Sequence, residues 1–168
     1  MPKIIENLES KLLEAARRQV AEAGYSAMTI RSVAKACGVG VGTVYNYFPS
    51  KDALLATYML EDWSQCIREI QAVSAVSEAP LLVVRCICHQ LIRYARQNQH
   101  IFQDPAAASA FAGSFSRYHG LLRSQLAAPL RKFCRDDFTA EFIAESLLTW
   151  TMAGRSTDEI CGIIEKLF

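Results

Sequence analysis

The 168-residue sequence lacks the features of several protein classes. It has no apolar run of about 18 residues or more, so no membrane-spanning helix is expected. Residues 1–6 lack the uninterrupted apolar stretch of a secretory signal, and we therefore expect a cytoplasmic protein. Neither the alternating pattern of strands nor an internal repeat is evident. The sequence predicts an all-α protein.

Signs of catalytic or metal chemistry are also scarce. No Ser-His-Asp order, paired-carboxylate site or phosphate-binding loop stands out, and three histidines offer few general bases. We therefore expect neither an enzyme nor a bound cofactor. The six cysteines form no C-x2-C pair of the zinc-finger type, and in a helical cytoplasmic protein they are expected to be small buried hydrophobic residues.

The charge of the chain gives little indication of its partners. The formal net charge is only +1. Residues 1–52 carry seven Lys and Arg against five acidic residues, a net charge of +2, and the remainder has a net charge of −1. A bias of this size does not by itself predict nucleic-acid binding. Apolar residues make up 51% of the chain, which predicts an extensive core and a possible subunit interface.

Apolar residues recur at helical spacing along most of the chain. This periodicity predicts helices over residues 3–23, 51–74, 80–97 and 139–153. An ambiguous helical piece over residues 101–111 and a further helix after Gly113 are also expected, the latter ended or kinked by Pro129. Ser156 and Glu159 match the S-x-x-E capping box and predict the start of a last helix.

The stretch from Thr29 to Lys51 has the pattern of two short helices joined by a glycine turn. Thr29 is a suitable N-cap for the first helix, which carries an apolar stripe. Gly38 follows at the reversal, where glycine adopts a positive φ without a clash. A second helix is expected over residues 41–47, before Pro49, and Ser50 is expected to cap the next one. This is a helix-turn-helix arrangement, whose second helix enters the DNA major groove.

Residues 12–55 closely resemble the N-terminal domain of TetR-family transcriptional regulators. The matching positions are Gly24-Tyr25, Thr29, Val33-Ala34, Gly38-Val39, Gly42-Thr43-Val44-Tyr45, Tyr47-Phe48, Ser50-Lys51 and Leu54. The resemblance covers about a third of the chain. It implies a helix-turn-helix DNA-binding domain over residues 1–52 and an effector-binding and dimerisation domain over residues 53–168.

The resemblance also indicates which residues contact DNA. We expect contacts from Thr29, Arg31, Gly42, Thr43, Tyr45, Asn46, Tyr47 and Lys51. Gly42 lets the recognition helix approach the duplex closely, Tyr45 offers a hydroxyl to a phosphate, and Thr43 suits a thymine methyl group. Lys51 opens the following helix and is expected near a phosphate. Gly40 departs from the family pattern, which usually has a polar residue there.

In this family the last two helices form the dimer interface, by packing against their copies as a four-helix bundle. The resemblance therefore predicts a homodimer that binds a near-palindromic operator. We expect the anchors to be large apolar residues, namely Phe142, Leu147, Trp150, Ile160, Ile164 and Leu167. Burial of these side chains within their own chain is the competing interpretation.

The resemblance further implies a repressor that a small-molecule effector releases from its operator. The expected pocket residues are Tyr58, Met59, Trp63, Cys86, His89, Tyr94, Phe102, Phe111, Phe115, Tyr118, His119 and Leu122. Their character predicts a largely apolar, aromatic ligand with one or two hydrogen-bonding groups. The long helix that begins at Lys51 is expected to transmit the effect of the ligand, because it belongs to both domains.

Two alternatives stay open at this point. The first is a thiol- or metal-responsive regulator that uses Cys86, Cys88 and His89. Residues two positions apart on a helix point in nearly opposite directions, however, so Cys86 and Cys88 cannot easily share one ion. The second is an interaction protein that keeps the fold but has lost DNA binding.

Overall fold

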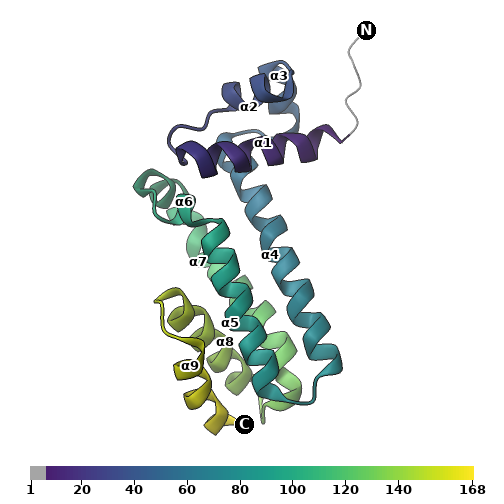
Figure 1. Ribbon diagram of the computed structural model, residues 1–168, viewed down its shortest axis with the longest axis vertical. Coiled ribbons are helices and arrows are strands. Elements are labelled where there is room, and N and C mark those ends of the chain that lie inside the picture. Colours follow the sequence, from purple (N-terminus) through teal and green to yellow (C-terminus); the bar gives the residue numbers. More distant parts are fainter. Residues whose placement is uncertain (1–6) are drawn as a thin grey trace. The chain divides into compact units, whose positions relative to one another are not determined.

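The computed structural model describes residues 7–168, with the side chains of residues 112–117 left out. The helices are α1 (Leu8–Ala23), α2 (Ile30–Cys37), α3 (Val41–Tyr47), α4 (Lys51–Val76), α5 (Pro80–Gln97), α6 (Gln99–Phe102), α7 (Pro105–Ala127), α8 (Asp137–Met152) and α9 (Thr157–Ile164) (Figure 1). Two 3-10 helices, Ala128–Phe133 and Glu165–Leu167, complete the described elements. The predicted all-α class is confirmed. No helix in the described range combines the length and apolar character that crossing a membrane requires.

Contacts divide the chain into two compact units. Unit 1 comprises the residues up to Glu61 together with Asn98–Ala112, and unit 2 comprises Asp62–Gln97 and Gly113–Phe168. Helices α4 and α7 therefore each contribute to both units. This division differs from a simple boundary at residues 52/53, because the first part of α4 and the segment of residues 98–112 share the core of the helix-turn-helix.

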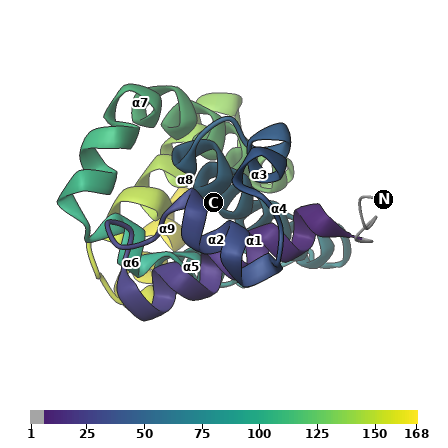
Figure 2. The same ribbon diagram turned by 90° about the horizontal axis from the view of Figure 1, so that it is seen from above.

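Unit 1 is built around α1, α2, α3 and the start of α4. Helix α2 packs against α1, and α3 packs against α2 (Figures 1 and 2). Its fully buried side chains include Leu12, Met28, Val33, Leu54 and Leu55. Burying large aliphatic side chains contributes about 1.5–3 kcal/mol each relative to exposure, so this core holds the short helices in place.

The boundaries of α2 follow the local sequence as predicted. The Thr29 hydroxyl accepts the backbone N–H of Ser32 at 3.0 Å, and the Ser32 hydroxyl accepts the backbone N–H of Thr29 at 3.1 Å. At the other end Gly38 has φ 67°, and the N–H of Val39 reaches the carbonyl of Ala34 at 3.0 Å. These bonds satisfy backbone groups that helix ends leave unpaired.

Unit 2 packs α5 against α8 and α9, with the second parts of α4 and α7 completing the core. Asp136 caps α8, and Ser156 and Glu159 form the predicted capping box of α9. One expectation needs correction. Helix α7 runs continuously from Pro105 to Ala127 and is not interrupted at Gly113. A helix tolerates an isolated glycine such as Gly113, and Pro105 at the first position together with the five alanines before Gly113 favours an early start.

Candidate nucleic-acid interface

Helix α3 presents aromatic side chains on the surface of unit 1. The exposed fractions are 51% for Tyr45 and 46% for Tyr47, whereas Val44 is fully buried and Phe48 is nearly so. Gly42 and Asn46 are also exposed, and Thr43 is half-buried. Two apolar anchors therefore fix the helix to the core and leave Tyr45 and Tyr47 available to a ligand on the outside.

The predicted contact residues of α2 lie at its first turn. Arg31 is exposed, whereas the Thr29 hydroxyl is already engaged in the capping box with Ser32. The hydroxyl of Ser32 also donates to the Gln19 side-chain oxygen at 2.6 Å. This bond ties α2 to α1. Nothing in the local pattern had marked Gln19, because the contact depends on how the two helices pack.

Lys51 is placed differently from a side chain that extends into solvent. Its ammonium donates to the backbone carbonyl of Tyr25 and lies 3.9 Å from the centroid of the Tyr25 ring. Desolvation lowers the pKa of Lys51. The ammonium that was predicted to lie near a phosphate therefore has an internal partner, the backbone carbonyl of Tyr25.

Tyr25 is a second link at the start of α4. Its hydroxyl donates to a carboxylate oxygen of Asp52 at 2.8 Å. Burial and the neighbouring Asp52 carboxylate raise the pKa of Tyr25 to about 12, so the hydroxyl stays protonated and keeps donating. Together with Lys51, Tyr25 fixes the turn between α1 and α2 on α4.

The residues predicted to bind an effector are divided between the two units. Tyr58, Met59, Phe102 and Phe111 belong to unit 1, where Tyr58 is buried and Phe102 is exposed. Trp63, Cys86, His89, Tyr94, Tyr118, His119 and Leu122 belong to unit 2. Phe115 lies outside the described side chains. Trp63 is buried, donates its ring N–H to Gln125 at 2.6 Å and packs edge-on against Tyr94.

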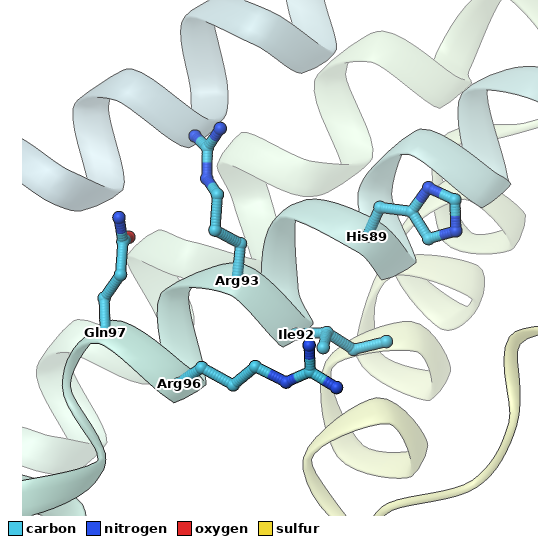
Figure 3. Close-up of a pocket in the computed structure, with 5 residues that line it drawn as sticks. All are labelled: His89, Ile92, Arg93, Arg96 and Gln97. Atoms are coloured by element: carbon cyan, nitrogen blue, oxygen red, sulfur yellow. The ribbon is translucent and has the colours of Figure 1, made fainter.

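A hollow of about 310 Å³ lies along the second half of α5 in unit 2. Its lining residues are His89, Ile92, Arg93, Arg96 and Gln97, of which only His89 had been predicted (Figure 3). Arg93 and Arg96 point in different directions. The Arg93 guanidinium is engaged by the Glu69 carboxylate at 2.9 and 3.0 Å, and Arg96 is exposed.

The cysteines show no arrangement of a metal site. Among the residues that the structure describes, no group of three or more His, Cys, Asp or Glu side chains is placed to hold a metal ion. Cys86 is half-buried and Cys88 is buried. Desolvation raises the pKa of both thiols, which favours the unreactive protonated form.

The residues predicted to form a dimer interface separate into two groups. Leu147, Ile160 and Ile164 are covered inside the core of their own unit, so they are not available as anchors. Leu167 is partly buried against that core. Phe142 and Trp150 are about half exposed, and sequence reasoning missed three further exposed apolar residues, Phe138, Met152 and Ile163. Phe138 precedes Phe142 by one helical turn, a spacing that the sequence already contained.

Comparison with known proteins agrees with this geometry. Residues 12–58 match the family described as "Bacterial regulatory proteins, tetR family". The repressor KstR of Mycobacterium tuberculosis is 28% identical over 108 residues, which cover 59% of this chain and 49% of KstR. The chain therefore spans about half the length of that relative.

Two solved structures have a similar fold over nearly the whole chain. Salmonella enterica GusR has a TM-score of 0.70 at 21% identity, covering 98% of both chains. FadR of Thermus thermophilus, a repressor in complex with lauroyl-CoA, has a TM-score of 0.64 at 23% identity, covering 95% of this chain and 92% of its own. Residues 12–58 therefore resemble the helix-turn-helix part of bacterial regulators of the tetR family, and the likeness of the whole chain to the two solved structures is a likeness of fold.

Proposed function

We propose that the chain is a homodimeric, sequence-specific DNA-binding repressor whose α3 enters the major groove. The observation that carries this proposal is the surface of α3. Two tyrosines stand half exposed on a seven-residue helix that Val44 and Phe48 anchor from behind. A folded monomer gains nothing from exposing two aromatic rings side by side on so short a helix, whereas a duplex offers phosphates and base edges to both.

The proposed contacts divide by type. Gly42, Thr43, Asn46 and Tyr47 meet base edges, with Gly42 allowing the close approach. Thr29, Arg31, Tyr45 and Lys51 meet phosphates, which hold the protein in register on the duplex. For Lys51 and Thr29 the backbone N–H groups at the starts of α4 and α2 supplement side chains that also have internal partners.

Electrophoretic retardation of the DNA that flanks the gene tests this proposal. We expect retardation that weakens steeply with salt, because each neutralised phosphate releases counterions. Tyr45→Ala and Tyr47→Ala should each weaken DNA binding about 10- to 100-fold, which is the loss of affinity expected when one good base or phosphate contact is removed. Leu82→Ala, which removes an exposed apolar side chain of unit 2, serves as the control and should bind normally.

Failure of the wild-type chain to retard any duplex would favour the alternative of an interaction protein that has lost DNA binding. If the wild type and both tyrosine variants retarded DNA equally, α3 would not be the helix that recognises the DNA sequence.

The proposed dimer uses the apolar side chains that α8 and α9 leave uncovered. Phe138, Phe142, Trp150 and Met152 lie on the exposed side of α8, and Ile163 lies on α9. Large apolar and aromatic residues of this kind supply most of the binding energy in protein interfaces. A two-fold dimer sets its recognition helices about 34–36 Å apart, or a multiple of that distance, and so reads a near-palindromic site.

We further propose that a small, largely apolar molecule releases the protein from its operator. Support comes from the fold shared with Thermus thermophilus FadR, which was solved in complex with lauroyl-CoA, and from the aromatic residues Trp63, Tyr94 and Tyr118 in unit 2. By linkage, a ligand that lowers DNA affinity by some factor must bind the DNA-free protein more tightly by the same factor.

Lauroyl-CoA is a suitable first probe for the proposed effector. The ligand should raise the unfolding temperature of the free protein and weaken DNA retardation in the same concentration range. A ligand that binds the free and DNA-bound protein equally well would contradict release by this route.

A further inference from the structure

Asp104 joins the start of α7 to the turn between α1 and α2. One carboxylate oxygen, Oδ1, accepts the backbone N–H groups of Ala106 at 2.8 Å and Ala107 at 3.3 Å. The other, Oδ2, accepts the backbone N–H of Ser26 at 3.3 Å and its hydroxyl at 3.1 Å. A single side chain therefore caps α7 and also holds a turn that lies 78 positions earlier in the chain.

The carboxylate is held in its charged form at this position. Desolvation acts to raise the pKa of Asp104, but the hydrogen bonds from Ala106, Ala107 and Ser26 outweigh it and lower the pKa below its ordinary value. Hydrogen bonds to an ionised carboxylate are stronger than those to a neutral acceptor. The link between Ser26 and α7 is thus present at neutral pH.

Apolar contacts support the same connection. Ile101 and Ala107 are buried in the core that α1, α2, α3 and α4 share. The ring of Phe111 packs edge-on against the ring of Tyr25, with centroids 6.4 Å apart. The segment of residues 98–112 is therefore a structural part of the unit that carries the helix-turn-helix.

The turn that Asp104 holds is the entry to α2. Tyr25 contacts Lys51 and Asp52 at the start of α4, and Ser26 contacts Asp104 at the start of α7. Helix α2 begins four residues later, at Ile30. The position of residues 25–26 thus affects where α2 begins, and α2 is in turn packed against α3.

We propose that Asp104 is a positioning residue for DNA recognition. By fixing Ser26 it fixes the entry to α2 and hence the presentation of α3. This inference rests on the proposed DNA-binding function.

Asp104→Asn separates the two roles of the side chain. Asparagine is as good an N-cap as aspartate, so its Oδ1 keeps the cap of α7, whereas its amide group replaces the oxygen that accepts from Ser26. We expect a near-normal unfolding temperature and faster amide exchange in residues 25–32. DNA binding should be about tenfold weaker, which is the loss expected when one charge-assisted hydrogen bond is removed.

Two further variants complete the experiment. Asp136→Asn makes the same change at the cap of α8 in unit 2, where the carboxylate accepts the Thr139 N–H at 2.7 Å, and it should leave DNA binding unchanged. Ser26→Ala removes the hydroxyl and leaves the cap of α7 intact. It should weaken DNA binding less than Asp104→Asn, with no further loss when the two changes are combined.

The outcomes separate this inference from the proposed function. If the wild-type chain binds no duplex, the proposed function fails. If the wild-type chain binds, and Asp104→Asn and Ser26→Ala bind as tightly with unchanged amide exchange, the positioning role is overturned. Should Asp104→Asn fail to fold, Ser26→Ala alone decides, since it does not alter the helix cap.

Discussion

At the scale of single residues, Gly42 is a glycine that the fold does not require and that the proposed DNA binding explains. A Cβ atom built on it would meet nothing within 4 Å in the protein, and its φ is not in the left-handed region. The fold therefore places no demand for glycine at this position. A helical glycine costs about 0.5–1 kcal/mol relative to alanine, so its presence calls for a partner outside the chain.

Gly42→Ala should accordingly raise the free energy of unfolding by about 0.5–1 kcal/mol while lowering DNA affinity, because the added methyl group meets the duplex. Urea unfolding and DNA titration of the same preparations measure the two effects. Gly120→Ala in α7, where a Cβ also meets nothing within 4 Å, provides the control and should not change DNA affinity. Tighter DNA binding by the Gly42 variant would contradict the close approach of α3.

The residues of this surface differ in how far the sequence predicts them. The exposure of Tyr45 and Tyr47 follows from helical spacing, because Val44 and Phe48 occupy the buried side of α3. The internal partner of the Lys51 ammonium and the bonds of Asp104 do not follow, since they join segments 26 and 78 positions apart. Local patterns carry no information about such contacts.

At the scale of helices, α3 lacks a side-chain cap. Its N-cap is Gly40, whose extended backbone (φ −72°, ψ 150°) any residue can adopt, and a Cβ there would lie 3.9 Å from the Thr43 hydroxyl oxygen, an ordinary contact. A serine hydroxyl at this position can accept the N–H of Thr43, which now bonds only to the Gly40 carbonyl at 3.0 Å.

Gly40→Ser is therefore expected to stabilise the protein by about 0.5–1 kcal/mol through the new cap and the lower entropy of the unfolded chain. DNA affinity should rise as well, because the hydroxyl adds a polar group beside the recognition helix. Thermal and urea unfolding measure the first effect, and DNA titration measures the second. A less stable protein would contradict the proposed role of the serine hydroxyl as a cap of α3.

The C-terminal end of α4 has a cation as its cap. The ammonium of Lys132 donates to the carbonyl oxygens of Ser74 and Ser77, both at 2.7 Å, and lies 3.7 Å from the carboxylate of Glu78. A positive charge at this end of a helix interacts favourably with its dipole and satisfies carbonyls that lack helical partners.

Lys132→Met keeps the length of the side chain and removes the charge. It should lower the free energy of unfolding by about 1–2 kcal/mol, because two carbonyl groups lose their donor. Lys166→Met, at an exposed lysine near the C-terminus, is the matched control and should have little effect. Equal stability of the two variants would mean that solvent replaces the Lys132 contacts without cost.

Helix boundaries were predictable where a cap lies next to the helix in the sequence. Thr29 and Ser156 illustrate this, since each is followed within three residues by its capping partner. The continuity of α7 was not predictable in the same way. Its first turn depends on Asp104, whose second partner, Ser26, becomes visible only when unit 1 is folded.

At the scale of the whole molecule, the uncovered apolar side chains of α8 bear on assembly. Phe142 and Trp150 are about half exposed, and Phe138 is exposed by 77%. Several large apolar residues on one helix face are unusual on the surface of a monomer and mark an interaction site. A second copy of the chain is the occupant that the proposed function requires.

Phe142→Glu should therefore dissociate the proposed dimer, weakening self-association by at least about 30-fold if Phe142 is a hot spot. Sedimentation of wild type and variant at micromolar concentration measures this effect. Leu82→Glu, at an exposed leucine of α5, controls for the introduced charge. A wild-type chain that sediments as a monomer would contradict the dimer.

The all-α class and the helix-turn-helix were accessible from spacing, caps and glycine positions. The division into units was less so. Residues 98–112 belong to the same unit as α1, α2 and α3 because Ile101, Ala107 and Phe111 pack into that core, and such packing has no local signature. The exposed face of α8 was predicted only in part, because apolar periodicity does not separate an internal core from an interface.

Selection of bound duplexes from a random pool tests the central claim most directly. The claim is that α3 reads DNA as part of a symmetric repressor. The wild-type chain should enrich a near-palindromic motif, and a variant carrying both Tyr45→Ala and Tyr47→Ala, with unchanged unfolding, should enrich none. Enrichment of no motif by the wild-type chain, or of the same motif by the double variant, would contradict the account.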